Sequence, residues 1–527
     1  YLLFNLGIVQ INIEKGVNAM RNALPNQSTS YWYDSVELPR YDKLKEKIKV
    51  DVGIVGAGMT GITAAYLLSK QGLKVCLIDA GLLLNGTTGH TTAKITAQHG
   101  MIYDEFISHF GEENAKLYYE ANNQAKKFIE SIIDEYKINC HYTTEDAYLY
   151  TESNDYITKL ENEYKAYEKL NIKGALTDTV DLPFSVKTAL TMSDQAHFHQ
   201  LKYLKTLLEA CKENGVYIYE QTRALTVEHN KHPTIITEDD HRIICRYVIQ
   251  ASHYPFYDGT GFYPAKMYAD RAYILACKTN KTVINGMYIN AETPTRSVRP
   301  IRINDEDLLL IAGDSHKTGQ SNKPMITHYE ALQQFTEKNF GLNEVLYRWS
   351  AQDLVTLDKI PYVGPVTKAQ SNVFVATGFR KWGMTNSTNA ALLISDLITE
   401  KDNPFKELFS PGRDIKPDPS IRKIISYNTD VAKHLIKGKM ERPNENIEKL
   451  QPNEACVTTV KGERAGVYKD TDGTLHAVDT TCTHMGCEVE WNNAENTWDC
   501  PCHGSRYTYT GDILNGPAVQ PLKKLDI

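Results

Sequence analysis

Two short loops near the C-terminus, both rich in cysteine and histidine, constrain this chain more than any other feature of its sequence. They read CTHMGC at residues 482–487 and CPCHGS at residues 500–505, and fifteen residues separate His484 from Cys500. Two thiolates and two imidazoles in matched loops suit a binuclear iron–sulfur cluster in which two Cys hold one iron and two His hold the other. The sequence therefore predicts a [2Fe–2S] site with four ligands: Cys482, His484, Cys500 and His503.

Both hexapeptides match, without a departure, the pattern of Rieske [2Fe–2S] domains of the high-potential, disulfide-containing kind, and this segment resembles them. The resemblance implies a disulfide between Cys487 and Cys502. It also implies that the hydroxyls of Ser505 and Tyr507 donate hydrogen bonds to cluster sulfurs, which favours the reduced cluster. A structural zinc site is the alternative. Zinc fingers usually pair Cys-x2–4-Cys with His-x3–5-His, and zinc would leave the second cysteine pair unexplained.

Length and composition place the chain among globular proteins with more than one domain. Its 527 residues suffice for two or three domains. A net charge of −7 and a pI near 6.2 give no electrostatic reason to expect a nucleic-acid partner. Six of the ten cysteines are scattered without spacing, which is typical of an intracellular protein rather than a secreted disulfide framework. No stretch reaches transmembrane length, so we expect a cytoplasmic protein without membrane contact.

A second motif, near residue 50, predicts a dinucleotide site. The order is strand, glycine-rich turn, helix, strand and acidic residue: 49–55, GAGMTG at 56–61, 62–70, 73–78 and Asp79. In this context Gly56 permits the tight turn, Gly58 lets the backbone approach a pyrophosphate, and Gly61 allows close helix–strand packing. Asp79 is placed to accept hydrogen bonds from the adenosine ribose, and the helix N-terminus to face the phosphates. A glycine-rich turn without a ligand is the alternative.

Later segments indicate FAD rather than NAD. A glycine- and threonine-rich loop spans 81–94, and a strand over 372–378 ends on glycine before an apolar helix over 390–398. In this layout residues 48–410 resemble the D-amino-acid oxidase and glycine/sarcosine oxidase superfamily of flavoproteins. The resemblance implies FAD and further cofactor contacts from Met59, Gly89, Gly378, Trp382, Gly383 and Met384. No second GxGxxG follows, so we expect no nicotinamide site.

The substrate-facing part is expected in residues 101–195 and 256–345. Four arginines are candidates for binding a substrate carboxylate, as an Arg does in many relatives: Arg271, Arg296, Arg299 and Arg380. Ordinary surface ion pairs are the alternative for each of them. His90 lies in the loop where some relatives attach flavin covalently, with a packing or polar role as the alternative. The sequence assigns no catalytic acid or base and no substrate.

These features predict an α/β plus all-β chain. It comprises a Rossmann-like FAD-binding domain interleaved with an α+β substrate domain, followed by a small β-sandwich Rieske domain. The parts are an N-terminal extension (1–45), the FAD-dependent oxidoreductase (46–410), a linker helix (411–445) and the Rieske domain (446–527). The FAD-binding segments are about 46–100, 196–255 and 346–410. The linker's apolar positions follow a helical period, with a membrane-surface helix as the alternative role.

The whole arrangement resembles bacterial FAD-dependent oxidoreductases that carry a C-terminal Rieske domain. We expect an enzyme in which FAD takes two electrons from a small organic donor, an amine or an amino acid, and returns them singly to the cluster. The cluster would then reduce an unidentified acceptor, a protein or a quinone. Two alternatives are a redox relay or sensor without its own substrate, and an oxygen-using oxidase with an ancillary Rieske domain.

Overall fold

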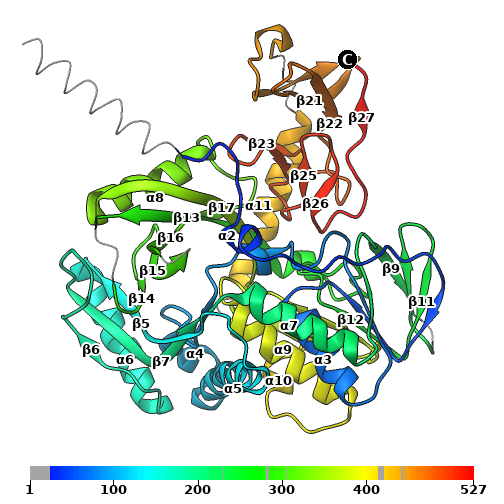
Figure 1. Cartoon of the computed structure of the whole chain (residues 1–527). Coiled ribbons are helices and arrows are strands. Elements are labelled where there is room, and N and C mark those ends of the chain that lie inside the picture. The colour runs from blue at the N-terminus through cyan, green and yellow to red at the C-terminus, as the bar shows by residue number, and fades with distance from the viewer. Residues whose placement is uncertain are drawn as a thin grey trace, which may run out of the picture.

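The computed structural model describes residues 24–229, 231–280, 284–303, 306–413, 420–440, 443 and 445–527. The expected N-terminal extension lies only partly within these residues, where it forms a short helix, α2 (Tyr31–Asp34). Two large sheets with their helices make up the body of the protein, and a smaller β domain near the C-terminus sits at one end of it (Figure 1). This is the α/β plus all-β architecture that the sequence predicts.

A six-stranded sheet forms the centre of the dinucleotide part. Its order is β18-β19-β12-β2-β3-β8, and all strands are parallel except β18. The strands are β2 (Val52–Val55), β3 (Val75–Ile78), β8 (Tyr217–Tyr219), β12 (Tyr247–Gln250), β18 (Tyr362–Pro365) and β19 (Val373–Thr377). Every residue of β2, β3 and β19 is buried, as expected where helices cover a parallel sheet.

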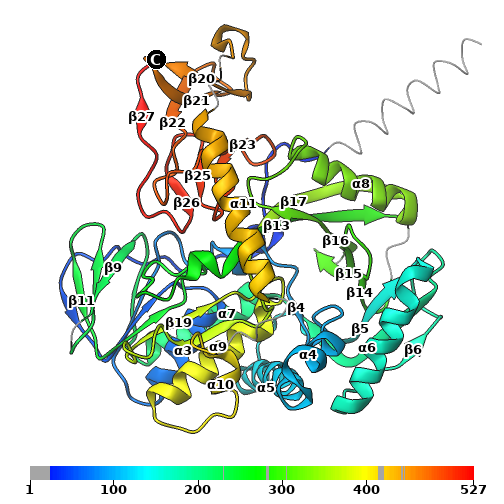
Figure 2. The same ribbon diagram turned by 180° about the vertical axis from the view of Figure 1, so that it is seen from behind.

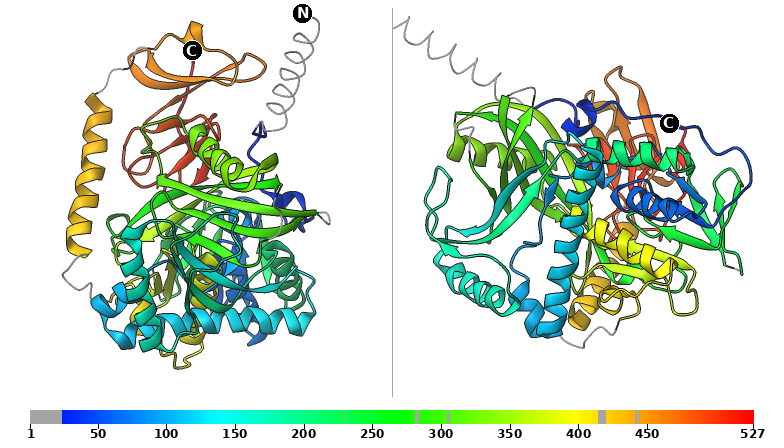
Figure 3. Two further views of the ribbon diagram at one scale, coloured as in Figure 1. Left: turned by 90° about the vertical axis from the view of Figure 1, so that its left-hand side faces the viewer. Right: turned by 60° about the horizontal axis from the view of Figure 1, so that its bottom comes forward.

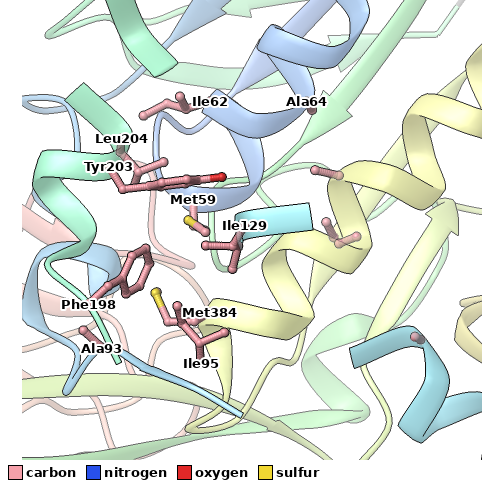
Figure 4. Close-up of a cluster of buried hydrophobic side chains, with 14 of the residues drawn as sticks. Met59, Ile62, Ala64, Ala93, Ile95, Ile129, Phe198, Tyr203, Leu204 and Met384 are labelled. Atoms are coloured by element: carbon pink, nitrogen blue, oxygen red, sulfur yellow. The ribbon is translucent and has the colours of Figure 1, made fainter. Parts of the chain in front are cut away.

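The helices beside this sheet share one apolar core. They include α3 (Met59–Lys70), α5 (Glu112–Tyr136), α7 (Gln200–Glu213) and α9 (Gly383–Ile398). Figure 4 shows side chains from these helices and from neighbouring strands meeting in this core: Met59, Ile62, Ile95, Ile129, Phe198, Tyr203, Leu204 and Met384. Helices α3 and α9 pack against one another within this core.

Two elements differ in extent from the sequence prediction. The strand expected over 49–55 is divided, because β1 (Ile48–Lys49) pairs with β11 (Arg242–Ile244) in a separate sheet. Between β1 and β2, the N–H of Asp51 donates to the carbonyl of Lys74. Helix α9 begins at Gly383 rather than at residue 390. Residues 385–389 are polar but buried, so an apolar pattern could not reveal the first part of the helix, about two turns.

A nine-stranded sheet forms the second part of the body. Its order is β17-β13-β16-β15-β14-β5-β7-β4, with β6 paired to β7. The strands are β4 (Lys94–Ile95), β5 (Thr143–Thr151), β6 (Leu176–Thr177), β7 (Thr188–His197), β13 (Met267–Thr279), β14 (Met287–Asn290), β15 (Arg296–Ile303), β16 (Glu306–Lys317) and β17 (Leu342–Thr356). Its helices are α4 (Tyr103–Phe110), α6 (Ile157–Leu170) and α8 (Ile326–Phe340). Ala272 and Ala351, which pair across β13 and β17, point to one face, and Arg271 and Gln352 point to the other.

The C-terminal domain consists of two four-stranded sheets. One contains β20 (Ala455–Val460), β21 (Glu463–Lys469), β22 (Leu475–Asp479) and β27 (Lys524–Leu525). The other contains β23 (Glu490–Asn492), β24 (Thr497–Asp499), β25 (Arg506–Thr508) and β26 (Ile513–Asn515). Both sheets are antiparallel. Trp498 of β24 is fully buried and packs with the cysteines of the two loops, which fixes those loops at one end of the domain.

A long helix connects the body to this domain. Helix α11 (Ser420–Met440) runs along the outside of the molecule, from the region of α10 (Lys406–Phe409) toward the C-terminal sheets (Figures 2 and 3). The remaining small sheet, with β9 (Ala224–Glu228), β10 (Thr234–Thr237), β1 and β11, lies at the edge of the dinucleotide part. Among the residues that the structure describes, no helix combines the length and the apolar character needed to cross a membrane.

Candidate functional site

The two cysteine- and histidine-containing loops have the same backbone conformation. In loop one (482–487) and in loop two (500–505), the N–H of the first residue donates to the carbonyl of the sixth, and the N–H of the fifth donates to the carbonyl of the first. These distances are 2.8 and 2.9 Å in loop one and 2.8 and 3.0 Å in loop two. The fifth residues, Gly486 and Gly504, have φ of 75° and 78°, where glycine is favoured. The chain thus builds two equivalent half-sites.

The four expected ligands lie together between these loops. The ring centroids of His484 and His503 are 5.0 Å apart, with the ring planes 89° to one another. The thiols of Cys482 and Cys500 are close enough that each shifts the pKa of the other. His484 is half-buried and the other three side chains are buried. The two histidines therefore sit side by side, and so do the two cysteines, as a cluster with a two-Cys iron and a two-His iron requires.

The protonation chemistry of this group fits a metal centre. Burial, and then the neighbouring His484, lower the pKa of His503 to about 4, so its imidazole is neutral. The buried Nδ1 of His503 has no hydrogen-bond partner among the described residues, which is unusual unless the atom serves another purpose. The Cys500 thiol lowers the pKa of Cys482, with a further contribution from Tyr507, while Cys482 and burial raise the pKa of Cys500. Neutral imidazoles and a thiolate are the forms that bind metal.

The remaining predicted residues of the loops surround these ligands. Cys487 and Cys502 are joined by a disulfide, with the sulfurs 1.97 Å apart. Their sulfurs and that of Cys500 lie within 4.8 Å of one another, but a bonded pair is no further ion site. The hydroxyl of Tyr507 is 3.3 Å from the Cys482 sulfur, and Ser505 Oγ accepts a hydrogen bond of 3.1 Å from the N–H of Ala518. Tyr507 thus already contacts a ligand sulfur.

A cavity of about 440 Å³ lies over the glycine motif. At Gly56, where φ is +105°, a Cβ would lie 2.4 Å from the carbonyl oxygen of Ala251, and at Gly61 a Cβ would lie 1.9 Å from the Gly56 carbonyl. Both positions therefore require glycine. At Gly58 the only close atoms belong to the side chain of Thr88, with Oγ1 at 2.9 Å. This glycine opens a path for a ligand toward the backbone.

The acidic residue at the end of β3 closes the turn. The Asp79 carboxylate accepts hydrogen bonds from the backbone N–H of Ala57 at 2.8 Å and of Gly81 at 2.9 Å. Burial raises its pKa, while these two hydrogen bonds act in the opposite direction. Each carboxylate oxygen has a second lone pair, so Asp79, which lines the cavity, can still accept from a ribose.

Most of the predicted cofactor contacts line this cavity. They are Gly56, Gly58, Met59, Asp79, Trp382, Gly383 and Met384. Gly61, Gly89 and Gly378 are absent from the lining. A Cβ at Gly89 would lie 2.3 Å from the ring of Tyr33, and one at Gly378 would lie 2.3 Å from Cγ2 of Thr356. In this structure these three glycines allow close packing behind the wall.

The cavity contains a lysine that the sequence reasoning did not single out. Lys94 of β4 donates a hydrogen bond of 2.7 Å to Ser297 Oγ, and its Nζ lies 5.4 Å from the ring centroid of Trp382. Burial, and then the charge of Arg299, lower its pKa to about 7. His253 also lines the cavity, and its buried Nε2 has no partner in the described part of the chain. No motif marks these residues, since only tertiary packing buries them.

The four candidate arginines occupy different places. Arg380 lines the cavity and donates a hydrogen bond of 3.3 Å to the carbonyl of His99. Arg271, Arg296 and Arg299 do not line it: Arg296 pairs with Asp314 at 3.3 Å, and Arg299 donates to backbone carbonyls. These three side chains are buried, so the alternative of surface ion pairs is wrong for them. His90 lines the cavity, with its Nδ1 2.9 Å from the Gly86 carbonyl.

The C-terminal domain supplies part of the cavity wall. Residues 513–519, called the closing segment below, line the cavity together with the glycine motif. Gln352 of β17 joins the same two regions on the other face of the sheet. Its Nε2 donates to the carbonyl of Gly504 at 2.8 Å, and its backbone carbonyl accepts from Thr87 Oγ1 at 3.0 Å. Thr87 lines the cavity and Gly504 follows the expected ligand His503, so Gln352 links cavity and loop two.

Loop two packs closely on the body. At Gly319, where φ is +70°, a Cβ would lie 2.7 Å from the nitrogen of Pro501. Gln320 Nε2 donates a hydrogen bond of 2.8 Å to the Pro501 carbonyl. From helix α11, the hydroxyl of Tyr427 donates to the carbonyl of Cys502 at 2.9 Å. The loop that carries two ligands is therefore held from the sheet and from the connecting helix.

Buried charges pair across the same interface. Arg271 of the body and Asp499 of the C-terminal domain, both 1% exposed, approach to 4.0 Å, and Arg506 lies 3.0 Å from the other oxygen of Asp499. Burial raises the pKa of Asp499, but Arg506 and Arg271 outweigh it and hold the pKa below its usual value. Tyr329 donates a hydrogen bond of 2.6 Å to Glu495. Separating the domains would take Asp499 from Arg271 and Tyr329 from Glu495, and breaking a buried charge pair is costly.

Comparison with known proteins agrees with this geometry. Residues 51–397 match the family model for FAD dependent oxidoreductases, DAO, and residues 443–526 match that of the Rieske [2Fe-2S] domain. The protein YhfW of Bacillus subtilis (strain 168), which carries the name of a Rieske 2Fe-2S iron-sulfur protein, is 50% identical over 498 residues, 94% of this chain and 97% of that protein. Gamma-glutamylputrescine oxidoreductase of Escherichia coli (strain K12) is 23% identical over 423 residues, 75% of this chain and 96% of that protein.

Among solved structures, glycine oxidase from Geobacillus kaustophilus has a similar fold. It aligns with a TM-score of 0.59 at 16% sequence identity and covers 70% of this chain and 100% of its own. Together with the family matches, this explains the cavity over the glycine motif and the paired loops. The chain belongs to the DAO family of FAD-dependent oxidoreductases and carries a C-terminal Rieske [2Fe–2S] domain, so that its cofactors are FAD and a [2Fe–2S] cluster.

Proposed function

We propose that this protein oxidises a small organic donor, an amine or an amino acid, at FAD and passes the electrons one at a time to its own [2Fe–2S] cluster. The observation that carries the proposal is the shared wall: the closing segment of the Rieske domain lines the same cavity as the glycine motif. When bound, FAD accepts two electrons from a donor, whereas the cluster stores one. A one-electron acceptor in the same chain can therefore take the two electrons of the reduced flavin one after the other.

The residues of the cavity suit an amine or amino-acid donor. Lys94, with a pKa of about 7, can take a proton from a substrate ammonium near neutral pH. Arg380 offers a guanidinium to a carboxylate in the same cavity. The names of gamma-glutamylputrescine oxidoreductase and glycine oxidase point to nitrogen-bearing donors for those proteins. We therefore propose a donor with a C–H bond beside nitrogen, and a separate protein or quinone as the final electron acceptor.

The interface favours this function over the two alternatives. An ancillary Rieske domain has no reason to form part of the cavity wall or to be held by Gln352 beside a ligand. A relay or sensor loaded by another protein does not need a cavity with Lys94 and Arg380 in its wall. Both observations support a substrate-oxidising enzyme with an internal electron acceptor.

Two anaerobic experiments test the proposal. First, a panel of amines and amino acids is mixed with the protein, and bleaching of the flavin and then of the cluster is followed by absorbance. Second, light and a sacrificial donor reduce the flavin directly, and the reduced cluster is detected by its EPR signal. We expect the cluster signal to follow flavin reduction in wild-type protein. A cluster that stays oxidised beside fully reduced flavin would contradict the proposal.

His484→Cys sharpens the second experiment. An additional thiolate charge on the cluster disfavours the reduced state and lowers its potential. We therefore expect slower and less complete reduction of the cluster by the flavin, with the flavin itself reduced by light as in wild-type protein.

A further inference from the structure

Tyr254 lies where the cavity meets the cluster loops. It follows β12 in the body and lines the cavity together with His253. Its ring centroid is 6.4 Å from that of His484, with the planes 67° to one another, an edge-on contact. The side chain is only 5% exposed. One buried aromatic residue therefore contacts both the cavity and a cluster ligand.

The backbone around Tyr254 is fixed by hydrogen bonds within the body. Ser252 Oγ donates a hydrogen bond of 2.8 Å to the carbonyl of Tyr254, and Thr377 Oγ1 donates one of 2.6 Å to the carbonyl of His253. From the Rieske side, the Cβ of Tyr254 lies 3.9 Å from where a Cβ at Gly516 of the closing segment would be. The two hydrogen bonds fix the backbone that carries the ring, and the closing segment lies beside it.

The hydroxyl of Tyr254 is buried and has no hydrogen-bond partner among the residues that the structure describes. A core tyrosine with only a packing role normally satisfies its hydroxyl.

We propose that Tyr254 is the bridging residue between FAD and the cluster, and that electrons enter the cluster at its His484 side. This inference rests on the proposed function. In each step one electron leaves the reduced flavin and reduces one ferric ion of the cluster, while Tyr254 is neither oxidised nor reduced. Its ring fills the space between the cavity and His484 with packed atoms. Without the ring this space would be a gap with no van der Waals contacts across it.

A second connection runs through Thr87, Gln352 and Gly504 by hydrogen bonds. It ends on the backbone carbonyl of Gly504, the residue that directly follows the ligand His503, rather than on the ligand side chain. Tyr254 instead contacts the ligand His484 with its own ring. This direct contact is the reason to assign the bridge to Tyr254, and it makes Gln352→Leu an informative comparison.

The test uses the holoprotein with both cofactors. A light flash with EDTA as sacrificial donor reduces the flavin under anaerobic conditions, and the cluster is followed by absorbance and by EPR. We expect Tyr254→Leu to lose the fast phase of cluster reduction and Tyr254→Phe, which keeps the ring, to retain it. Flavin content, iron and sulfide content, the EPR spectrum and the cluster potential should match wild type in both variants, which a merely structural defect would not allow.

Tyr257→Leu is the matched control, since Tyr257 lies three residues away, is half-buried and does not line the cavity. We expect it to keep the fast phase. If Tyr254→Leu fails to hold either cofactor, Tyr254→Met replaces it, because Met fills irregular space without an aromatic ring, and the same loss is expected.

The outcomes separate this inference from the proposed function. If the wild-type cluster stays oxidised while the flavin is fully reduced, the proposed function fails, whatever Tyr254 does. If wild-type protein transfers electrons and Tyr254→Leu does so equally fast, the assignment of Tyr254 fails and the proposed function stands. Loss of the fast phase in Gln352→Leu but not in Tyr254→Leu would move the bridge to the hydrogen-bonded route and overturn this inference.

Discussion

Replacing Gly504 by alanine should loosen the contact between loop two and the body of the protein. Gly504 has φ of 78°, and an added Cβ would lie 2.3 Å from the Cβ of Ala269 and 3.1 Å from Nε2 of Gln352. The first distance is far below van der Waals contact, and neither Ala269 nor the backbone of β13 can move without disturbing the sheet. The substitution therefore affects the interface between the domains as well as the loop itself.

The magnitude follows from two terms. The left-handed backbone conformation costs alanine about 1–2 kcal/mol, and forcing an extra methyl group into a packed site costs about 1–3 kcal/mol. Gly462 provides a matched control in the same domain, since its φ is 87° and nothing lies within 4 Å of an added Cβ. Gly462→Ala should therefore lose stability only through the cost of the left-handed backbone conformation. The difference of about 1–3 kcal/mol corresponds to an equilibrium shift of about fivefold to about 150-fold toward the undocked domain.

Urea unfolding, followed by the cluster absorbance, measures the loss of stability. The fast phase of flavin-to-cluster transfer measures the loosening of the interface between the domains. We expect Gly504→Ala to unfold at a lower urea concentration than Gly462→Ala and to lose part of the fast phase, while Gly462→Ala keeps all of it. Equal unfolding midpoints together with unchanged transfer in both variants would refute the reasoning, because the clash with Ala269 would then have no consequence.

Three further predictions concern the cofactor sites. Gly58→Val places a branched side chain against Thr88 Oγ1, which lies 2.9 Å from the Cβ position, so the folded variant should bind its cluster but no FAD; normal flavin content would contradict this. Replacing both Cys487 and Cys502 by Ser removes a cross-link between residues 15 apart, and loop entropy predicts a loss of about 3 kcal/mol of folding stability. The cluster of this variant should bleach faster in chelator than that of wild-type protein, and an equal rate would contradict the prediction. The pKa of Lys94 is about 7 in the folded protein and 10.5 when unperturbed. Between these two pH values Lys94 carries a proton in the unfolded chain but not in the folded protein, so the free energy of unfolding rises with pH. Lys94→Met should therefore stabilise FAD-free protein more at about pH 6 than at about pH 10, and an equal gain in melting temperature at both would count against the buried lysine.

The sequence was sufficient to identify the cluster and dinucleotide motifs because their chemistry is local. Each half-site of the cluster lies within six residues, and its ligands are defined by spacing alone. The glycine motif is likewise recognisable because Gly56 and Gly61 have no room for a Cβ. Where a backbone conformation or a metal dictates residue types over a short stretch, the pattern can be read directly.

Contacts between distant segments could not be predicted in this way. Gln352, Tyr254 and Lys94 are ordinary residues in their local sequence, and they gain their importance from residues at least 130 positions away (roughly the size of a whole domain). Arg271 was a candidate for substrate binding, but it faces the Rieske domain, because side chains alternate between the faces of β13. Which face Arg271 points to depends on the register of β13. That register is set by pairing with the neighbouring strands, which the local sequence around Arg271 does not reveal.

The wall formed by residues 513–519 bears on how such a protein can be recombined. The boundary between the two domains in the sequence does not coincide with the boundary of the FAD cavity, since a segment near the end of the chain completes a site that begins near residue 55. A transplanted Rieske domain would have to reproduce the shape of this segment as well as the two ligand loops. The flavin domain and the iron–sulfur domain therefore cannot be exchanged independently, because residues of both domains form the wall of one cavity.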